Sequence, residues 1–229
     1  MSTEAIQQTL EAVGQHYDAQ KMMTVRHMTR DAIRQISRAV KPGMVEEDAV
    51  EMAKDLLASL GMLRGWHDVY VRFGSNTTKT FGEASDPGVV LGQDDIFLID
   101  IGPTWKEWEG DGGDTFVTGT DAGKARCASD AREIFHEVRK HWLETSDSGK
   151  VLYEVAVAAA KRRGWVLNMD LSGHRLADFP HAAIYEGPMA EVDFKPSRQL
   201  WVLEIHIRNA DHTYGAFFED MLLEDDFFN

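Results

Sequence analysis

Charged carboxylates interrupt three of the most apolar segments of this chain. Asp100 directly follows the apolar run at 96–99, Glu204 lies within the apolar segment 200–205, and Glu219 follows two phenylalanines. Burying an ionised carboxylate is strongly unfavourable unless a partner compensates its charge. Because three such residues occur in strand-like segments, we infer that the folded chain brings them to a compensating cation.

Two further residues extend this set to one suited to metal ions. Asp111 comes eleven residues after Asp100, and His174 lies in a Ser-Gly-His segment. Two neighbouring divalent ions need bridging oxygen ligands, and Asp111 and Glu219 are suited to that role. Three residues would each serve one ion: Asp100, His174 and Glu204. Taken singly, each of the five has an ordinary structural explanation, so the hypothesis rests on the set.

The composition excludes several classes of protein. The chain has 229 residues with 43% hydrophobic and 27% charged residues, which is ordinary for one globular domain. Its formal net charge of −14 argues against a nucleic-acid-binding protein and against a polybasic membrane anchor. The single cysteine, Cys127, rules out an intrachain disulfide. With no visible signal peptide or membrane span, we expect a cytoplasmic protein.

Hydrophobic periodicity predicts alternating helices and strands without a dividing linker. Helical spacing runs from residue 4 to about 40, where Lys-Pro-Gly ends it. The remaining elements are predicted as helices at 45–60, 125–145 and 150–163, and as strands at 69–73, 96–100, 115–118, 200–208 and 215–223. This alternation favours an α+β domain in which helices cover a curved antiparallel sheet.

The spacing of the five residues also carries a family resemblance. Residues 100–102 read Asp-Ile-Gly, and residues 111–119 read Asp-Gly-Gly-Asp-Thr-Phe-Val-Thr-Gly. This pair resembles the aspartate signature of the M24 family, which includes methionine aminopeptidase, aminopeptidase P and prolidase. Ser-Gly-His-Arg-Leu at 172–176, with His181 seven residues after His174, is similar to the histidine segment of that family. Glu204 and Glu219 fit its two late glutamates.

The resemblance implies the pita-bread fold, in which two α+β halves are related by a pseudo-twofold axis around a dinuclear metal site. It implies hydrolysis of an amide bond near the amino end of a peptide or small-molecule substrate, with manganese, cobalt, zinc or iron. The whole chain, 1–229, would then be a single catalytic domain whose residues 1–20 form a helical extension. Relatives are often dimers, so a homodimer is among the expected assemblies.

Departures from the family pattern fall on the substrate side. Many family peptidases have a histidine seven residues after a glycine in the loop before the first aspartate, and Phe81 occupies that place here. His181 is retained, and we expect it to donate a hydrogen bond to the substrate carbonyl. Because side chains alternate along a strand, His206 and Arg208 would share the face of Glu204. His206 is therefore a candidate catalytic group, beside its alternative as a structural histidine.

Two further residues are candidates for substrate binding. Arg208 could bind a substrate carboxylate through two parallel hydrogen bonds. Trp105, which lies between the two aspartates, could line the mouth of the cleft, although a packing role is an equal alternative. We interpret the other histidines as structural: His16, His27, His67, His136, His141 and His212.

Three functions remain open from the sequence. The favoured one is a dinuclear metallohydrolase that acts on a peptide or another small amide. The second is an enzyme of the same scaffold with changed chemistry, such as the cleavage of a non-peptide C–N bond or a reaction of redox iron. The third is a binding module, which the retention of all five ligand types argues against.

Overall fold

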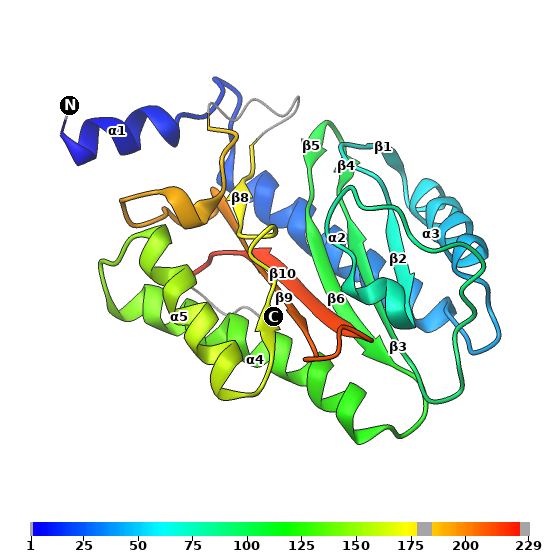
Figure 1. Cartoon of the computed structure of the whole chain (residues 1–229). Coiled ribbons are helices and arrows are strands. Elements are labelled where there is room, and N and C mark those ends of the chain that lie inside the picture. The colour runs from blue at the N-terminus through cyan, green and yellow to red at the C-terminus, as the bar shows by residue number, and fades with distance from the viewer. Residues whose placement is uncertain (1, 178–184, 225–229) are drawn as a thin grey trace.

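A computed structural model describes residues 2–177 and 185–224. Within these ranges, one long antiparallel sheet runs through the molecule in the order β2-β3-β6-β10-β9-β7, with the short β8 paired to β9 (Figure 1). A small separate sheet has the order β1-β4-β5. No helix of the described residues has the length and apolar character that crossing a bilayer requires.

The long sheet consists of two halves built in the same order. The first half comprises α2 (Ala19–Ala39), α3 (Glu46–Ser59), β2 (Tyr70–Phe73), β3 (Ile96–Ile101) and β6 (Gly112–Val117). The second comprises α4 (Ala122–Glu144), α5 (Gly149–Arg162), β7 (Val166–Leu167), β9 (Trp201–Arg208) and β10 (Gly215–Met221). In each half the first strand lies at the edge and the third lies at the centre, where β6 pairs with β10. This arrangement is the expected pseudo-twofold.

The remaining elements are short and lie around this sheet. They are α1 (Thr3–Leu10), β1 (Met62–Gly65), η1 (Gly74–Thr78), β4 (Pro103–Trp105), β5 (Trp108–Glu109), β8 (His174–Arg175) and η2 (Met189–Glu191). The predicted helical segment 4–40 is divided into α1 and α2, which corrects the sequence interpretation. Asp18 is the reason for the second start, because its carboxylate accepts hydrogen bonds from Gln20 N and Lys21 N as a helix N-cap.

The extension before α2 is held by polar contacts rather than by a buried face. None of the residues in α1 is buried. The chain just after it is anchored to the second half, where Trp201 Nε1 donates to Glu11 Oε1 at 2.7 Å and Arg175 donates to the carbonyls of Leu10 and Ala12. Figure 1 shows α1 projecting away from the sheet.

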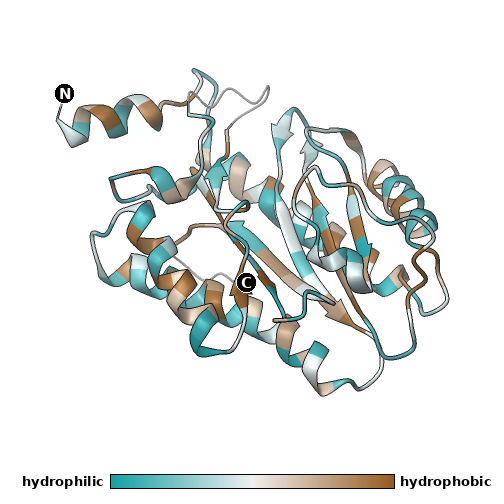
Figure 2. Ribbon diagram, in the orientation of Figure 1, coloured by the Kyte–Doolittle hydropathy of each residue, from teal (hydrophilic) through white to brown (hydrophobic). Residues whose placement is uncertain are grey.

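Alternation along the central strands gives the sheet two different faces. Asp114 of β6 accepts from Arg30 of α2 at 3.1 Å and from Arg132 of α4 at 2.7 Å, so both helices cover the face to which Asp114 points. Asp220 of β10 pairs with Arg26 of α2 at 2.7 Å on the same face. Neighbouring residues in these strands must therefore point to the opposite face. Figure 2 shows hydrophilic stretches beside hydrophobic ones in the central strands.

Candidate metal centre

Strand register brings three of the expected ligands into one row on the face opposite the helices. Asp100 of β3 pairs with Gly113 of β6, Gly113 pairs with Glu219 of β10, and Glu219 pairs with Glu204 of β9. The row crosses from the first half to the second at its centre. Both halves of the fold thus contribute carboxylates to one line across the sheet.

Gly113 leaves the space that this row requires. A Cβ atom at Gly113 would lie 2.5 Å from Cε1 of Phe217 and 3.2 Å from Cγ of Glu219. A side chain in the middle of the row would therefore displace the neighbouring groups. Asp111 comes two residues before Gly113, just ahead of β6, and so lies beside the middle of the row.

Asp111 and Glu219 lie together with His174, as the metal hypothesis requires. One potential ligand atom from each of these residues lies within 4.8 Å of the other two. His174 Nε2 is 3.0 Å from Asp111 Oδ2. The buried Glu204 approaches the same place from β9, and its Oε2 accepts from Gly173 N at 2.8 Å. The five residues predicted as ligands thus gather at one place in the fold.

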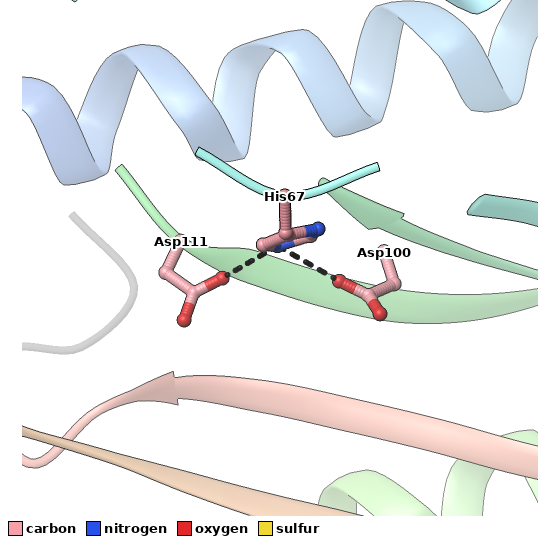
Figure 3. Close-up of side chains that lie close together, drawn as sticks. All are labelled: His67, Asp100 and Asp111. Carbon is pink, nitrogen blue, oxygen red and sulfur yellow. Dashed lines mark hydrogen bonds and ion pairs between the residues drawn. The ribbon is translucent and has the colours of Figure 1, made fainter. Parts of the chain in front are cut away.

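A sixth residue, His67, also lies at this place, although no pattern in the sequence indicates that it belongs to the site. His67 forms a second group with Asp100 and Asp111, whose potential ligand atoms also lie within 4.8 Å of one another. Its Nε2 is 3.6 Å from Asp100 Oδ1 and 3.4 Å from Asp111 Oδ1 (Figure 3). Asp111 is common to both groups, so the two groups form one continuous site.

Burial raises the pKa values of three carboxyl groups in the site, whereas two histidines lower the pKa of the fourth. Burial, reinforced by Asp111, raises the pKa of Glu219 well above its usual value, and burial raises the pKa of Glu204 to about 7. Burial also raises the pKa of Asp100. Burial alone would raise the pKa of Asp111 too, but His174 and His67 outweigh it and lower that pKa to about 2. Asp111 is therefore the most firmly ionised of the four carboxylates.

The two imidazoles respond to these carboxylates. Burial alone would lower their pKa values, but Asp100 and Asp111 raise the pKa of His67 to about 9, and Asp111 raises that of His174 to about 10. Without a metal ion, both rings carry protons at neutral pH and compensate part of the acidic charge. A divalent cation would replace those protons, because metal ligands must be deprotonated.

An open pocket of about 260 Å³, in part continuous with solvent, adjoins the site at Asp100. Its walls are largely apolar and aromatic, with two cationic side chains; they comprise Tyr70, Arg72, Lys79, Phe81, Leu98, Asp100, Leu171, His206 and Phe217. Phe81 is half exposed, and its ring lies edge-on to His67 with 5.7 Å between centroids. The predicted substrate-side residue Phe81 therefore lies beside both the pocket and the metal-site residues.

His206 lines this pocket, but hydrogen bonds occupy both of its ring nitrogens. Nε2 lies 2.8 Å from the carbonyl oxygen of Thr77, and Nδ1 lies 3.1 Å from Nδ2 of Asn168. Burial lowers the pKa of His206 to about 4, so the ring is neutral. The neutral ring donates from Nε2 and accepts at Nδ1. The predicted catalytic role would require one of these hydrogen bonds to break.

The other predicted substrate-side residues differ in their placement. Arg208 is partly buried, and its Nε has no hydrogen-bond acceptor among the described residues. Trp105 is only 1% exposed and donates its indole N–H to Thr29 Oγ1 at 2.9 Å, so it lies in the core and does not line the pocket. Trp66 instead lies at the site, with its ring 5.6 Å from that of His174. His181 falls outside the described residues.

The fold and the site together define a protein with two pseudosymmetric halves and a cluster of candidate metal ligands between them. The chain belongs to metallopeptidase family M24, whose family model matches residues 20–224. This membership confirms the resemblance seen in the sequence, and the fold is the pita-bread fold of that family. No curated protein matches the sequence at a significant level.

Solved structures agree with this assignment. An X-Pro aminopeptidase from Thermotoga maritima superposes with a TM-score of 0.73 at 18% identity, covering 99% of this chain and 66% of that protein. A prolidase from Pyrococcus furiosus gives a TM-score of 0.70 at 17% identity, covering 97% of this chain and 65% of that protein. A methionine aminopeptidase from Thermotoga maritima gives a TM-score of 0.70 at 15% identity, covering 92% of this chain and 94% of that protein. This chain thus spans about two thirds of the first two proteins.

Proposed function

We propose that this protein is a dinuclear metal-dependent hydrolase that cleaves an amide bond near the amino end of a short peptide. One observation carries the proposal: Asp111 is shared between two ligand groups, one with Asp100 and one with His174 and Glu219. A shared carboxylate between two donor groups is the arrangement that two adjacent ions require. Membership of family M24 supports the same conclusion.

An unsatisfied oxygen atom in the site fits the binding of cations. Glu219 Oε1 is buried and has no hydrogen-bond partner among the described residues. A buried carboxylate oxygen without a donor is unfavourable, and a metal ion supplies the missing charge and contact. The oxygen-rich donor set with imidazole suits manganese, iron, cobalt or zinc. We propose two such ions.

In the proposed enzyme, one set of side chains binds the ions and another set binds the substrate. Asp111 and Glu219 would bridge, while Asp100, His174 and Glu204 would each bind one ion. Bound ions of this kind lower the pKa of a water molecule and polarise a carbonyl group. The apolar walls of the adjoining pocket, including Phe81 and Phe217, would take up a substrate side chain and exclude water from it.

A second candidate function concerns the same site with a substrate other than a peptide. Phe81 occupies the place of a hydrogen-bonding histidine of many family peptidases, and it presents an apolar ring to the pocket. A substrate that needs no donor at that place, such as a small non-peptide amide, would fit this change. The lone cysteine Cys127 is buried, which is consistent with the cytosolic location that we propose for either activity.

An assay with defined peptides separates the two functions. Protein loaded in turn with manganese, cobalt, iron and zinc should release the amino-terminal residue from at least one of a set of Met-, Ala- and Xaa-Pro peptides. The Asp111→Asn variant should lose this activity, because it removes a bridging charge. Bound metal without cleavage of any peptide would contradict the peptidase and favour the non-peptide amide.

A further inference from the structure

His67 approaches the carboxylates from the first half of the fold, from the loop between β1 and β2. Its side chain is 6% exposed, and Figure 3 shows the ring between Asp100 and Asp111. Its Nε2 faces Asp111 Oδ1, whereas Nε2 of His174 faces the other oxygen, Oδ2. Each oxygen of the shared carboxylate therefore has its own imidazole.

Both imidazoles are fixed in the same way by the backbone. His67 Nδ1 lies 2.6 Å from the carbonyl oxygen of Asp68, and His174 Nδ1 lies 2.7 Å from that of Arg175. In each ring, Nδ1–H donates to the carbonyl of the next residue and Nε2 is directed at the carboxylates. Histidines that bind metals commonly donate their other ring N–H to a carbonyl group, which fixes the tautomer and the ring orientation.

The surrounding backbone leaves a space that His67 fills. A Cβ atom at Gly102 would lie 2.2 Å from Cδ2 and 2.4 Å from Nε2 of His67. Trp66 packs edge-on against the His67 ring, with 4.6 Å between centroids, and its indole N–H donates to Gly110 O at 2.7 Å. The His67 ring is thus held in one position between Gly102 and the Trp66 side chain.

We propose that His67 is a sixth protein ligand, which binds through Nε2 the ion on the Asp100 side of Asp111. The proposal rests on the proposed dinuclear centre. The five residues expected from the sequence supply one imidazole, His174, to the Glu219 side, and none to the Asp100 side. With His67, each ion has one nitrogen ligand and shares Asp111. A second imidazole ligand favours the binding of iron, cobalt, nickel or zinc over magnesium and calcium, which prefer oxygen ligands.

Cobalt(II) titration of metal-free protein tests this ligand directly. The variants are His67→Asn, which retains a side-chain donor near Nδ1 but cannot reach the ion, and His67→Ala. The matched control is His27→Ala, because His27 is exposed on α2. Circular dichroism of each metal-free variant verifies its folding, so that a loss of metal is not a loss of structure.

Calorimetry of the wild type and the control should show two cobalt equivalents. In both His67 variants, one equivalent should bind more than tenfold more weakly. Loss of a residue that only hydrogen-bonds to a metal ligand already lowers metal affinity by about 10–100-fold. Unchanged affinity for both equivalents in the folded variants would overturn the role of His67 alone. Absence of cobalt binding by the wild type would overturn the dinuclear centre as well.

Proton NMR of the cobalt-loaded protein provides a second readout that does not depend on activity. Each imidazole bound through Nε2 retains an exchangeable Nδ1–H, whose resonance is strongly shifted by the paramagnetic ion. The His67→Asn variant should show one such resonance fewer than the wild type, and the His27→Ala control should show the same number. An equal number in His67→Asn and the wild type would overturn the proposal.

Discussion

Individual carboxylates of the site destabilise the metal-free folded protein when they are ionised. Burial is the largest cause that raises the pKa of Asp100, Glu204 and Glu219, and neighbouring carboxylates add to it. A raised carboxyl pKa means that the folded state resists ionisation relative to the unfolded chain. The protein therefore retains groups that favour ion binding and oppose folding without ions.

Glu219→Gln should stabilise the metal-free protein at pH 7. The pKa of Glu219 is raised, so its contribution to stability is present below the unfolded value near 4.5 and is lost as the pH rises through the folded pKa. The amide cannot ionise and removes that loss, so we expect a higher free energy of unfolding than that of the wild type at pH 7. Urea denaturation between pH 4.5 and 8 measures both the gain and the flatter pH profile.

Added metal should reverse the order of stability. The wild type should gain about 2.7 kcal/mol at a metal concentration of 100 times the dissociation constant, while Glu219→Gln, which has lost a bridging ligand, should gain less. The exposed Glu154 on α5 supplies the control variant, Glu154→Gln, which should change neither measurement. A metal-free Glu219→Gln protein less stable than the wild type would contradict this account of the site.

The sequence predicted five residues that the structure gathers at this site, but it did not single out His67, and the reason lies in strand register. The motif spacing from Asp100 to Glu219 is visible along the chain, whereas His67 lies outside every motif of the set. The available signal was its position three residues before Tyr70, which pairs with Asp100. That pairing depends on how β2 and β3 align in space, which hydrophobic periodicity does not specify.

Among the secondary structure elements, the register of the strands determines where the site lies. Residues in four adjacent strands form the row Asp100, Gly113, Glu219 and Glu204, and the missing side chain of Gly113 is part of that arrangement. Periodicity predicted these strands to within a few residues. It did not predict β1, β4 and β5, because they are short and belong to a separate small sheet.

Gly113→Ala should weaken metal binding without changing any ligand. The new methyl group would meet the Phe217 ring at 2.5 Å and Glu219 Cγ at 3.2 Å, so either the ring or the ligand must move. Overpacking of this kind costs about 1–3 kcal/mol of stability. Calorimetric titration measures the metal affinity, and the double variant Gly113→Ala/Phe217→Ala should regain part of it. Wild-type affinity in the single variant would contradict the role of Gly113.

In the molecule as a whole, the candidate metal ligands come from both halves of the fold. Asp100 and Asp111 come from the first half and His174, Glu204 and Glu219 from the second, so bound ions would link the halves across the centre of the sheet. The α+β class and the pita-bread fold followed from the element pattern and the family signature. The break between α1 and α2 was missed because apolar spacing continues across it, and the Asp18 cap determines the second start.

Anomalous X-ray scattering from crystals grown with cobalt, manganese or zinc would locate the metal ions of the proposed centre. We predict two metal peaks on either side of Asp111, one within ligand distance of Asp100 and the other within ligand distance of Glu219 and His174. Crystals of the Asp111→Asn variant, grown in the same way, should lose occupancy at both positions. Wild-type crystals with no anomalous peak between Asp100 and Glu219 would contradict a metal centre in this protein.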